Sequence, residues 1–415
     1  MSGAEIVSFG CRLNIAEGEA IRLAAGDADD LIIFNTCAVT AEAERQARQA
    51  IRKAARAHPE KRIIVTGCGA EISRSIYEAM PEVAGVVGNL GKGDASSFSS
   101  FPRRRESGLA EIGSRLRGSD ATPALSGLDH ARAFVEVQNG CDHDCTFCVT
   151  TLARGPSRSV PAGGVIDAIK AVVERGQQEA VLTAVDLTSY GADLPGQPAL
   201  GLLVERILKT VPDLPRLRLS SLDCIEIDDR LFDLIAHEPR LMPHLHLSLQ
   251  SGDDMILKRM KRRHSRADAV ALVQRLKSAR PDLTIGADLI AGFPTEDEAM
   301  FANTLALLDD ADIVLAHIFP YSPRPGTAAA RMPQVANRVA KDRAARLRET
   351  AEARQAAWLE TLIGSVQPVL IENRQSGHAP NFAKVRMDAP YAPRGTILPL
   401  RITGRTGQTL LGAPA

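Results

Sequence analysis

Short apolar runs alternate with helix-like segments along the first ninety residues of the chain. This alternation is typical of a parallel sheet whose strands are joined by crossover helices. The expected strands cover residues 6–9, 31–34, 63–65 and 83–87, and the expected helices cover 16–25, 41–57 and 70–80. We therefore predict an open parallel α/β sheet domain over residues 1–95.

A second series of apolar runs follows between residues 131 and 320, again with helical segments between them. Six strands are expected, at residues 134–138, 180–184, 216–220, 244–249, 283–290 and 313–319. Six such repeats indicate an incomplete (β/α) barrel, whose reactive centre would lie at the carboxyl ends of its strands. With a long connecting helix expected over 337–362, we assign residues 131–363 to this unit.

The last fifty residues change character and contain short strands separated by turns, at 366–371, 383–387, 396–402 and 409–411. A small antiparallel β-barrel over residues 364–415 fits this pattern. Residues 96–130 are expected to form a linker, with only 109–116 helix-like. The predicted fold class is α/β: an open parallel sheet domain, a partial (β/α)6 barrel and a small β-barrel.

Composition places the chain among globular proteins of two or three domains. Its 415 residues are 45% hydrophobic and 24% charged. These values are typical of folded proteins, so we expect no long disordered segment. No run of eighteen apolar residues occurs, and the polar start Met1–Glu5 lacks a signal-peptide pattern. We expect a cytoplasmic protein without membrane contact, and a monomer.

Charge is informative only locally, because the formal net charge is zero. From Ser365 to Ala415 there are six lysines and arginines against Glu372 and Asp388, so the module carries 6 − 2 = +4. A basic module suits phosphate contacts. The alternative is a small domain that closes the edge of the larger barrel.

Three cysteines stand directly after the first barrel strand, at CxxxCxxC spacing: Cys141, Cys145 and Cys148. Three thiolates in one loop can hold three irons of a cubane iron–sulfur cluster and leave the fourth iron open to a ligand. The alternative is a zinc loop with His143 or a distant side chain as fourth ligand. Zinc loops more often combine two CxxC-like pairs, so the spacing favours an iron–sulfur cluster.

Three further cysteines, Cys11, Cys37 and Cys68, each follow a successive strand of the first domain. The carboxyl ends of parallel strands face one crevice, so these residues should be neighbours in space. We predict a second cluster on them, although each alone could be a buried apolar cysteine. Cys224 belongs to neither set and is treated as incidental.

Several phrases of the sequence resemble one known family. The cysteine motif with Phe147 before its last cysteine is similar to the radical S-adenosylmethionine (SAM) signature, and the following LARGPSRS resembles the methylthiotransferase branch of that superfamily. SFGCRLN, NTCAVTAEAERQARQAIRK and VTGCGAE resemble the amino-terminal domain of methylthiotransferases. Within that family, the chain most resembles the enzymes that methylthiolate N6-threonylcarbamoyladenosine in tRNA. The basic tail resembles their RNA-binding TRAM domain.

The resemblance implies two 4Fe-4S clusters and SAM as cofactors. The cluster on Cys141, Cys145 and Cys148 would cleave SAM to methionine and a 5′-deoxyadenosyl radical, and the cluster on Cys11, Cys37 and Cys68 would provide the sulfur. A second SAM would methylate that sulfur before transfer. The clusters must then face a common cavity. The residues implied to bind SAM, at strand ends and in the cysteine loop, are Phe147, Asp186, Ser221, Gln250 and Gly292.

The implied reaction is methylthiolation of carbon 2 of threonylcarbamoyladenosine at position 37 of tRNA, with a reducing electron donor and a sulfur source as further partners. Two features depart from that branch: Val149–Ala153 follows the cysteines where an Ile-Ile-Pro-Tyr-Gly type phrase is usual, and Glu136 stands where lysine is frequent. The alternatives are methylthiolation of isopentenyladenosine tRNA or of a ribosomal-protein aspartate, and a non-catalytic iron–sulfur or zinc protein that binds RNA.

Overall fold

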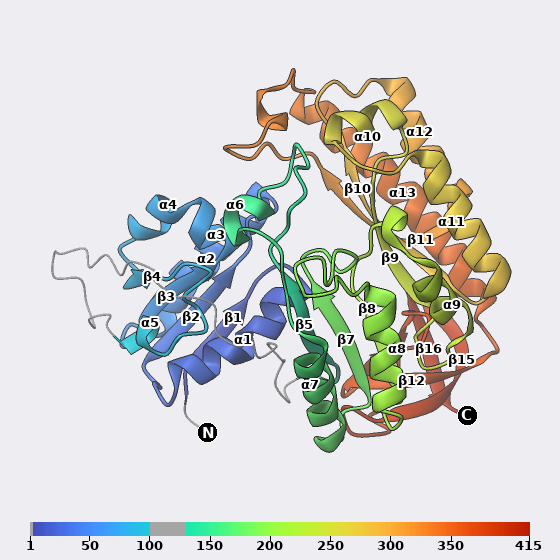
Figure 1. The fold of residues 1–415 in the computed structure, drawn as a ribbon, viewed down its shortest axis with the longest axis horizontal. Helices are drawn as coiled ribbons and strands as arrows, with labels where there is room; N and C mark the ends of the chain where they lie inside the picture. Colours follow the sequence, from blue (N-terminus) through green and yellow to red (C-terminus); the bar gives the residue numbers. More distant parts are fainter. Residues whose placement is uncertain (1–2, 100–129) are drawn as a thin grey trace.

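A computed structural model describes residues 3–99 and 130–415. Three units are seen in Figure 1: an amino-terminal sheet with its helices in blue, a central barrel from green to orange, and a small barrel in red. The predicted linker residues 100–129, with the helix expected at 109–116, lie outside the described residues. Among the described helices, none has the length and apolar character needed to cross a bilayer.

The amino-terminal unit is the predicted parallel sheet, with strand order β1-β2-β3-β4. Its strands are β1 (Glu5–Ser8), β2 (Leu31–Thr36), β3 (Arg62–Gly67) and β4 (Gly85–Val86). Its helices are α1 (Arg12–Ala25), α2 (Ala41–Ala57), α3 (Cys68–Ile72), α4 (Arg74–Glu78) and α5 (Ser96–Ser99). The single helix expected over 70–80 is divided at Ser73, whose hydroxyl donates to Glu44 Oε1 at 2.9 Å. A serine that bonds away from its own helix favours such a break.

The central unit contains the six predicted parallel strands, in two sheets that isolated bridges connect. They are β5 (Ala133–Asn139), β7 (Glu179–Ala184), β8 (Arg216–Leu219), β9 (His244–Gln250), β10 (Thr284–Ala291) and β11 (Ile313–Pro320). The helices are α6 (Thr150–Arg154), α7 (Ala162–Glu174), α8 (Leu200–Thr210), α9 (Asp229–His237), α10 (Asp254–Met260), α11 (Arg266–Ala279), α12 (Glu298–Asp310) and α13 (Asn337–Thr361). A short strand that was not predicted, β6 (Arg158–Ser159), pairs antiparallel with the end of β5. The fold class is therefore confirmed.

The amino-terminal unit packs on the first strands of the central barrel. Ala16 of α1 is buried with Phe134 of β5 and Val181 of β7 in a small apolar cluster. Farther along, Arg324 after β11 forms a buried ion pair with Glu44 of α2, at 2.6 Å between Nη2 and Oε1. The carboxyl ends of the amino-terminal strands therefore face the mouth of the central barrel. They lie on the side where β5 ends and the cysteine loop begins.

The small barrel is closed, in the order β12-β13-β14-β16-β15. Its strands are β12 (Val366–Asn373), β13 (Ser376–His378), β14 (Lys384–Arg386), β15 (Ile397–Thr406) and β16 (Thr409–Pro414). Four neighbouring pairs are antiparallel as expected, whereas β14 and β16 run parallel because they close the barrel. Leu359 of α13 joins its apolar core, so the long helix connects the two barrels.

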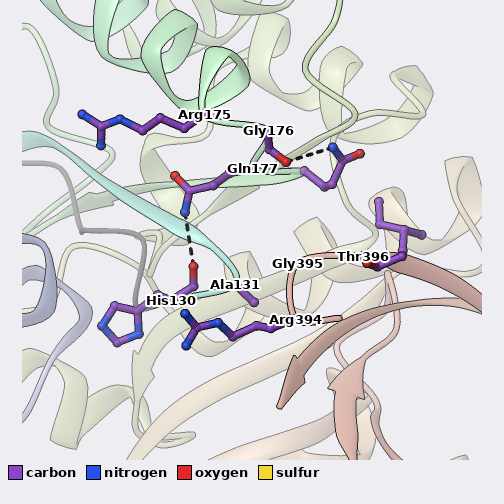
Figure 2. Close-up of a pocket in the computed structure, with 10 residues that line it drawn as sticks. His130, Ala131, Arg175, Gly176, Gln177, Arg394, Gly395 and Thr396 are labelled. Atoms are coloured by element: carbon purple, nitrogen blue, oxygen red, sulfur yellow. Dashed lines mark hydrogen bonds between the residues drawn. The ribbon is translucent and has the colours of Figure 1, made fainter. Parts of the chain in front are cut away.

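The small barrel covers the amino ends of the central strands. Arg218 of β8 donates to the carbonyl oxygens of Ala379 and Pro380, at 3.0 and 2.8 Å. A cavity of about 490 Å³ remains at this end, between the turn before β7 and the segment Arg394–Ile397 (Figure 2). Its lining contains no cysteine, and it lies at the end of the strands opposite the cysteine loop.

Candidate active site

A cavity of about 570 Å³ lies where the amino-terminal unit meets the mouth of the central barrel. Cys11 and Cys37 line it from one side, and Phe147, from the CxxxCxxC loop, lines it from the other. Residues at the ends of β7 to β11 complete the wall, among them Thr183, Ser220, Ser221, His246, Gln250, Asp288, Ile290 and His317. The amino-terminal triad, through Cys11 and Cys37, and the CxxxCxxC loop, through Phe147, therefore border one cavity, as the sulfur-donor hypothesis requires.

The three cysteines of the amino-terminal sheet are brought together as predicted. A Cβ atom placed on Gly10 would lie 2.7 Å from Cys37 Sγ, so only glycine allows the Cys11 loop to approach Cys37 this closely. Gly10 also has φ +91°, a conformation that glycine adopts without strain. Burial, together with the neighbouring Cys11 and Cys68, raises the pKa of Cys37 to about 12. Three clustered thiols of this kind need a cationic group to become thiolates.

Arg154 of the LARGPSRS segment, at the end of α6, reaches across the domain boundary to this triad. Its Nε donates to Cys68 Sγ at 3.0 Å, and its Nη2 donates to Asn14 Oδ1 at 2.7 Å. Its Nη1 donates to Glu17 Oε1 at 2.7 Å and to Asn139 Oδ1 at 2.9 Å. A donor on a ligating sulfur is typical of the shell around an iron–sulfur centre.

Glu17 balances this arginine and a lysine in the same buried position. Lys92 Nζ lies 2.6 Å from Glu17 Oε2, and both side chains are less than a tenth exposed. Burial alone would raise the pKa of Glu17, but the charges of Lys92 and Arg154 outweigh it and lower the pKa to about 2. The carboxylate is therefore ionised at neutral pH and holds the two cations beside Cys68.

The loop after β5 gathers Cys141, Cys145 and Cys148. The backbone N–H of His143 donates to Cys141 Sγ, and that of Thr150 donates to Cys148 Sγ, each at 3.4 Å. Arg262 Nη1 donates to Cys145 Sγ at 3.6 Å. Each sulfur thus has a donor, which suits thiolate ligands of a cluster. Because burial raises the pKa of Cys141 to about 12, these thiols also become ligands only together with metal charge.

Both triads fit a cubane cluster by donor chemistry. Each offers three soft ligands, each is supplied with N–H donors, and neither contains a fourth cysteine among the described residues. Cys224 is buried beside Asp223 and belongs to neither triad.

One form of the zinc alternative uses His143 as the fourth ligand, but both nitrogens of its ring already have partners. Its Nδ1 lies 3.3 Å from Asp186 Oδ2, and its Nε2 lies 3.4 Å from the hydroxyl of Ser189. Cys141, His143 and Asp186 could together approach one ion, but such a site would leave Cys145 and Cys148 unused. Asp186 and Ser189 therefore hold the ring of His143 in place.

The remaining residues predicted to bind SAM divide into two groups. Phe147, Ser221 and Gln250 line the cavity, and Phe147 packs edge-to-face on Phe293. Asp186 and Gly292 do not line it. Asp186 accepts hydrogen bonds from Thr188 and Ser189, and a Cβ on Gly292 would lie 2.3 Å from Ala340 Cβ, so Gly292 serves close packing with α13.

The cavity wall also contains a histidine–aspartate–histidine group that the sequence did not predict. Asp288 Oδ1 lies 3.0 Å from His246 Nε2 and 3.3 Å from His317 Nδ1, and the two rings pack at 4.7 Å. Burial alone would raise the pKa of Asp288, but hydrogen bonds from both histidines outweigh it and hold the pKa well below its usual range. The two histidines lie on separate strands, β9 and β11, and share no sequence pattern with Asp288 on β10.

Arg12 was not predicted as a site residue, although it stands next to Cys11. It is the first residue of α1 and lines the cavity. Its guanidinium carbon lies 5.5 Å from the ring centroid of Phe382, which belongs to the small barrel. The signal in the sequence was a basic residue adjoining a predicted cluster ligand.

Glu136 and the segment Val149–Ala153, which depart from the family pattern, lie in different surroundings. Glu136 of β5 is half-buried near Glu17 and accepts a hydrogen bond from Asn139 Nδ2 at 2.8 Å. Burial and the charge of Glu17 raise its pKa to about 7. The segment Val149–Ala153 runs into α6, where Leu152 is 59% exposed and Ala153 accepts a hydrogen bond from Asn89 of the amino-terminal unit.

Two family models match the chain, and together they cover both cysteine triads. The radical SAM superfamily matches residues 135–308, and a family described as uncharacterized protein family UPF0004 matches residues 4–88. The first includes Cys141, Cys145 and Cys148, and the second includes Cys11, Cys37 and Cys68.

Characterised relatives are similar over most of the chain. Threonylcarbamoyladenosine tRNA methylthiotransferase MtaB of Rickettsia prowazekii is 47% identical, over 96% of this chain and 94% of its own. The Aquifex aeolicus protein of the same name is 34% identical, over 88% and 92%. The tRNA-2-methylthio-N(6)-dimethylallyladenosine synthase of Erythrobacter litoralis is 33% identical, over 88% and 86%.

Solved structures agree with the fold. The radical SAM methyltransferase TsrM from Kitasatospora setae, with cobalamin and a [4Fe-4S] cluster bound, superposes with a TM-score of 0.54 at 16% identity, over 80% of this chain and 77% of its own. The cobalamin-dependent radical SAM enzyme OxsB gives a TM-score of 0.52 at 10% identity, over 85% and 56%. At these identities the likeness concerns the fold alone.

Proposed function

Because this chain belongs to the family of threonylcarbamoyladenosine tRNA methylthiotransferases, we propose that it attaches a methylthio group to carbon 2 of N6-threonylcarbamoyladenosine at position 37 of tRNA. The enzyme is a radical SAM transferase that uses SAM and two 4Fe-4S clusters. The observation that carries the proposal is one cavity lined by Cys11 and Cys37 on one side and by Phe147 of the CxxxCxxC loop on the other.

The chemistry requires both triads. In our proposal Cys141, Cys145 and Cys148 hold the cluster that binds SAM, and Cys11, Cys37 and Cys68 hold the second cluster. When bound, these groups supply the electron that cleaves SAM and the sulfur that enters the product. The protein's own residues exclude water, orient the reactants and provide hydrogen bonds to the ligating sulfurs.

Three features of the cavity support these tasks. Arg154 and Arg262 donate to Cys68 and Cys145 and place positive charge beside ligands that must be anionic. Phe147 and Ile290 give part of the wall an apolar surface, which shields a reactive radical from polar side reactions. Ser221 and Gln250 provide polar groups for SAM in our proposal.

The remaining assignments follow from this role. We propose that residues 1–95 carry the second cluster, 96–130 link it to the SAM-binding core at 131–363, and 364–415 contact RNA. On β14, exposed Lys384 and Arg386 flank the buried Val385, so two positive side chains face outward together. Such a surface suits phosphate contacts. We infer a monomer in the cytoplasm, with a reducing electron donor and a separate sulfur source.

Nucleoside mass spectrometry of tRNA from a deletion strain tests the proposal. We expect threonylcarbamoyladenosine to accumulate and its 2-methylthio derivative to disappear, with restoration by the intact gene but not by a Cys145→Ala gene. Loss of a methylthiolated isopentenyladenosine instead would assign the related substrate, and an unchanged nucleoside profile would remove tRNA as the substrate. Production of 5′-deoxyadenosine by reconstituted protein with dithionite and SAM separates an enzyme from a non-catalytic RNA-binding protein.

A further inference from the structure

Arg12 differs from the other arginines that gather at the same place in the fold. The guanidinium groups of Arg12, Arg132 and Arg218 all lie over the ring of Phe382, with Cζ 5.5, 5.1 and 5.2 Å from its centroid. Arg12 comes from the amino-terminal unit, the other two from the central barrel, and Phe382 from the small barrel. All three units therefore converge behind one wall of the cavity.

Two of these arginines are neutralised by carboxylates. Arg218 Nε lies 2.6 Å from Glu179 Oε1, and Arg132 pairs with both Glu179 and Glu372. Arg12 forms no hydrogen bond or ion pair with any of the described residues, although it is the first residue of α1 and borders the cavity. Glu179 and Asp288 act on the Arg12 charge only from a distance. A partly buried guanidinium that no carboxylate contacts is costly, and an anion that enters the cavity can relieve that cost.

The cavity wall contains few acidic groups that could compete with an anionic ligand for Arg12. Among its lining residues the only acidic side chain is Asp288, and that carboxylate already accepts from His246 and His317. Among the described residues of the lining, Arg12 is also the only arginine or lysine. The carboxylates beside Arg132 and Arg218 are already paired with those two arginines. An anion is therefore favoured at this point of the wall.

We propose that Arg12 is the specificity residue that binds the carboxylate of the threonyl group on the substrate nucleoside. This inference rests on the proposed function and deepens it. A threonylcarbamoyl group ends in a free carboxylate, whereas the dimethylallyl group named for a relative of the same family is a hydrocarbon. A guanidinium can hold a carboxylate through two parallel hydrogen bonds. A site built for such a contact rejects a substrate that lacks the charged group, because the arginine would then remain unpaired.

A binding measurement with two substrates tests the role of Arg12. The probes are fluorescent anticodon stem-loop RNAs that carry either threonylcarbamoyladenosine or its methyl ester, which lacks the carboxylate charge and adds one methyl group. Both are titrated with anaerobically reconstituted holoenzyme without reductant, so that no turnover occurs. We expect wild-type protein to bind the acid about 10- to 100-fold more tightly than the ester, the range for a charge-assisted contact.

Replacement of Arg12 should remove this preference. Arg12→Met is expected to weaken binding of the acid and leave binding of the ester nearly unchanged, so that the acid-to-ester ratio falls to about one. Arg12→Lys should retain part of the ratio, and Arg74→Met, on the exposed surface of α4, should keep all of it. Iron content and circular dichroism show whether each variant is folded and loaded.

Two results would overturn the inference. The first is a wild-type ratio near one, which requires no variant at all. The second is an unchanged ratio in Arg12→Met, the outcome expected if Arg12 binds the carboxylate of SAM or only supports the fold, because either role affects both RNAs equally. The nucleoside profile of the deletion strain decides the proposed function separately, so the two failures can be told apart.

Discussion

Replacement of Arg154 by methionine tests whether this side chain fastens the amino-terminal unit to the central barrel. The Arg154 side chain is 3% exposed, and its guanidinium bonds to Glu17, Asn14 and Asn139 as well as to Cys68. Methionine has similar length and no charge, so Arg154→Met removes all of these hydrogen bonds while it keeps much of the side-chain volume. The change should weaken the docking of α1 on β5.

The magnitude follows from the contacts that remain. Loss of one partner from a buried ion pair costs about 3–5 kcal/mol, mainly because the other charge is left uncompensated. Here Lys92 still lies 2.6 Å from Glu17, so the carboxylate keeps one cation and the lower end of that range applies. A loss of about 3 kcal/mol corresponds to a roughly 100-fold increase in local opening.

Hydrogen–deuterium exchange of the native protein measures this opening in peptides that cover α1 and α6. Arg154→Met should reduce protection there by roughly 100-fold. The matched control is Arg74→Met, which removes an exposed ion pair with Glu78 in the same unit and should cost at most about 0.5 kcal/mol. Equal losses of protection in the two variants would refute the assignment of Arg154 as the connection between the units.

Three further variants probe the clusters, a half-buried carboxylate and the helix packing. Cys145→Ala should abolish 5′-deoxyadenosine formation, whereas Cys68→Ala should spare it and stop methylthio transfer; equal effects on both reactions would contradict separate roles. Burial and a neighbouring carboxylate raise the pKa of Glu136 from 4.5 to about 7, so its contribution to stability is present below pH 4.5 and is lost as the pH rises through 7. Glu136→Gln should therefore raise the urea midpoint more at pH 8 than at pH 5, and equal gains would contradict this shift. Gly292→Ala should destabilise α13 by more than about 1 kcal/mol, because its φ is +73° and the new methyl group would clash; Gly163→Ala in α7, where a Cβ meets nothing within 4 Å, should be neutral or stabilising.

Strand periodicity was a reliable guide to the fold because it depends on short-range chemistry. Apolar runs such as Leu31–Thr36 and Ile313–Pro320 form strands with their expected starts, since a buried strand needs a continuous apolar segment and little else. The break at Ser73 was not predicted, because it results from a hydrogen bond to Glu44 of a different helix. The parallel pairing of β14 and β16 likewise depends on how the small barrel closes.

The sequence by itself determined which residues can serve as cluster ligands, because three thiols in one loop and three thiols after successive strands follow from spacing and strand order. Only the tertiary structure decided which charged side chains surround them. Arg154 meets Cys68 across 86 residues of chain, and Arg12 meets Phe382 from another unit. Such contacts depend on how the three units dock, which is a property of their complementary surfaces and leaves no periodic signal in the chain.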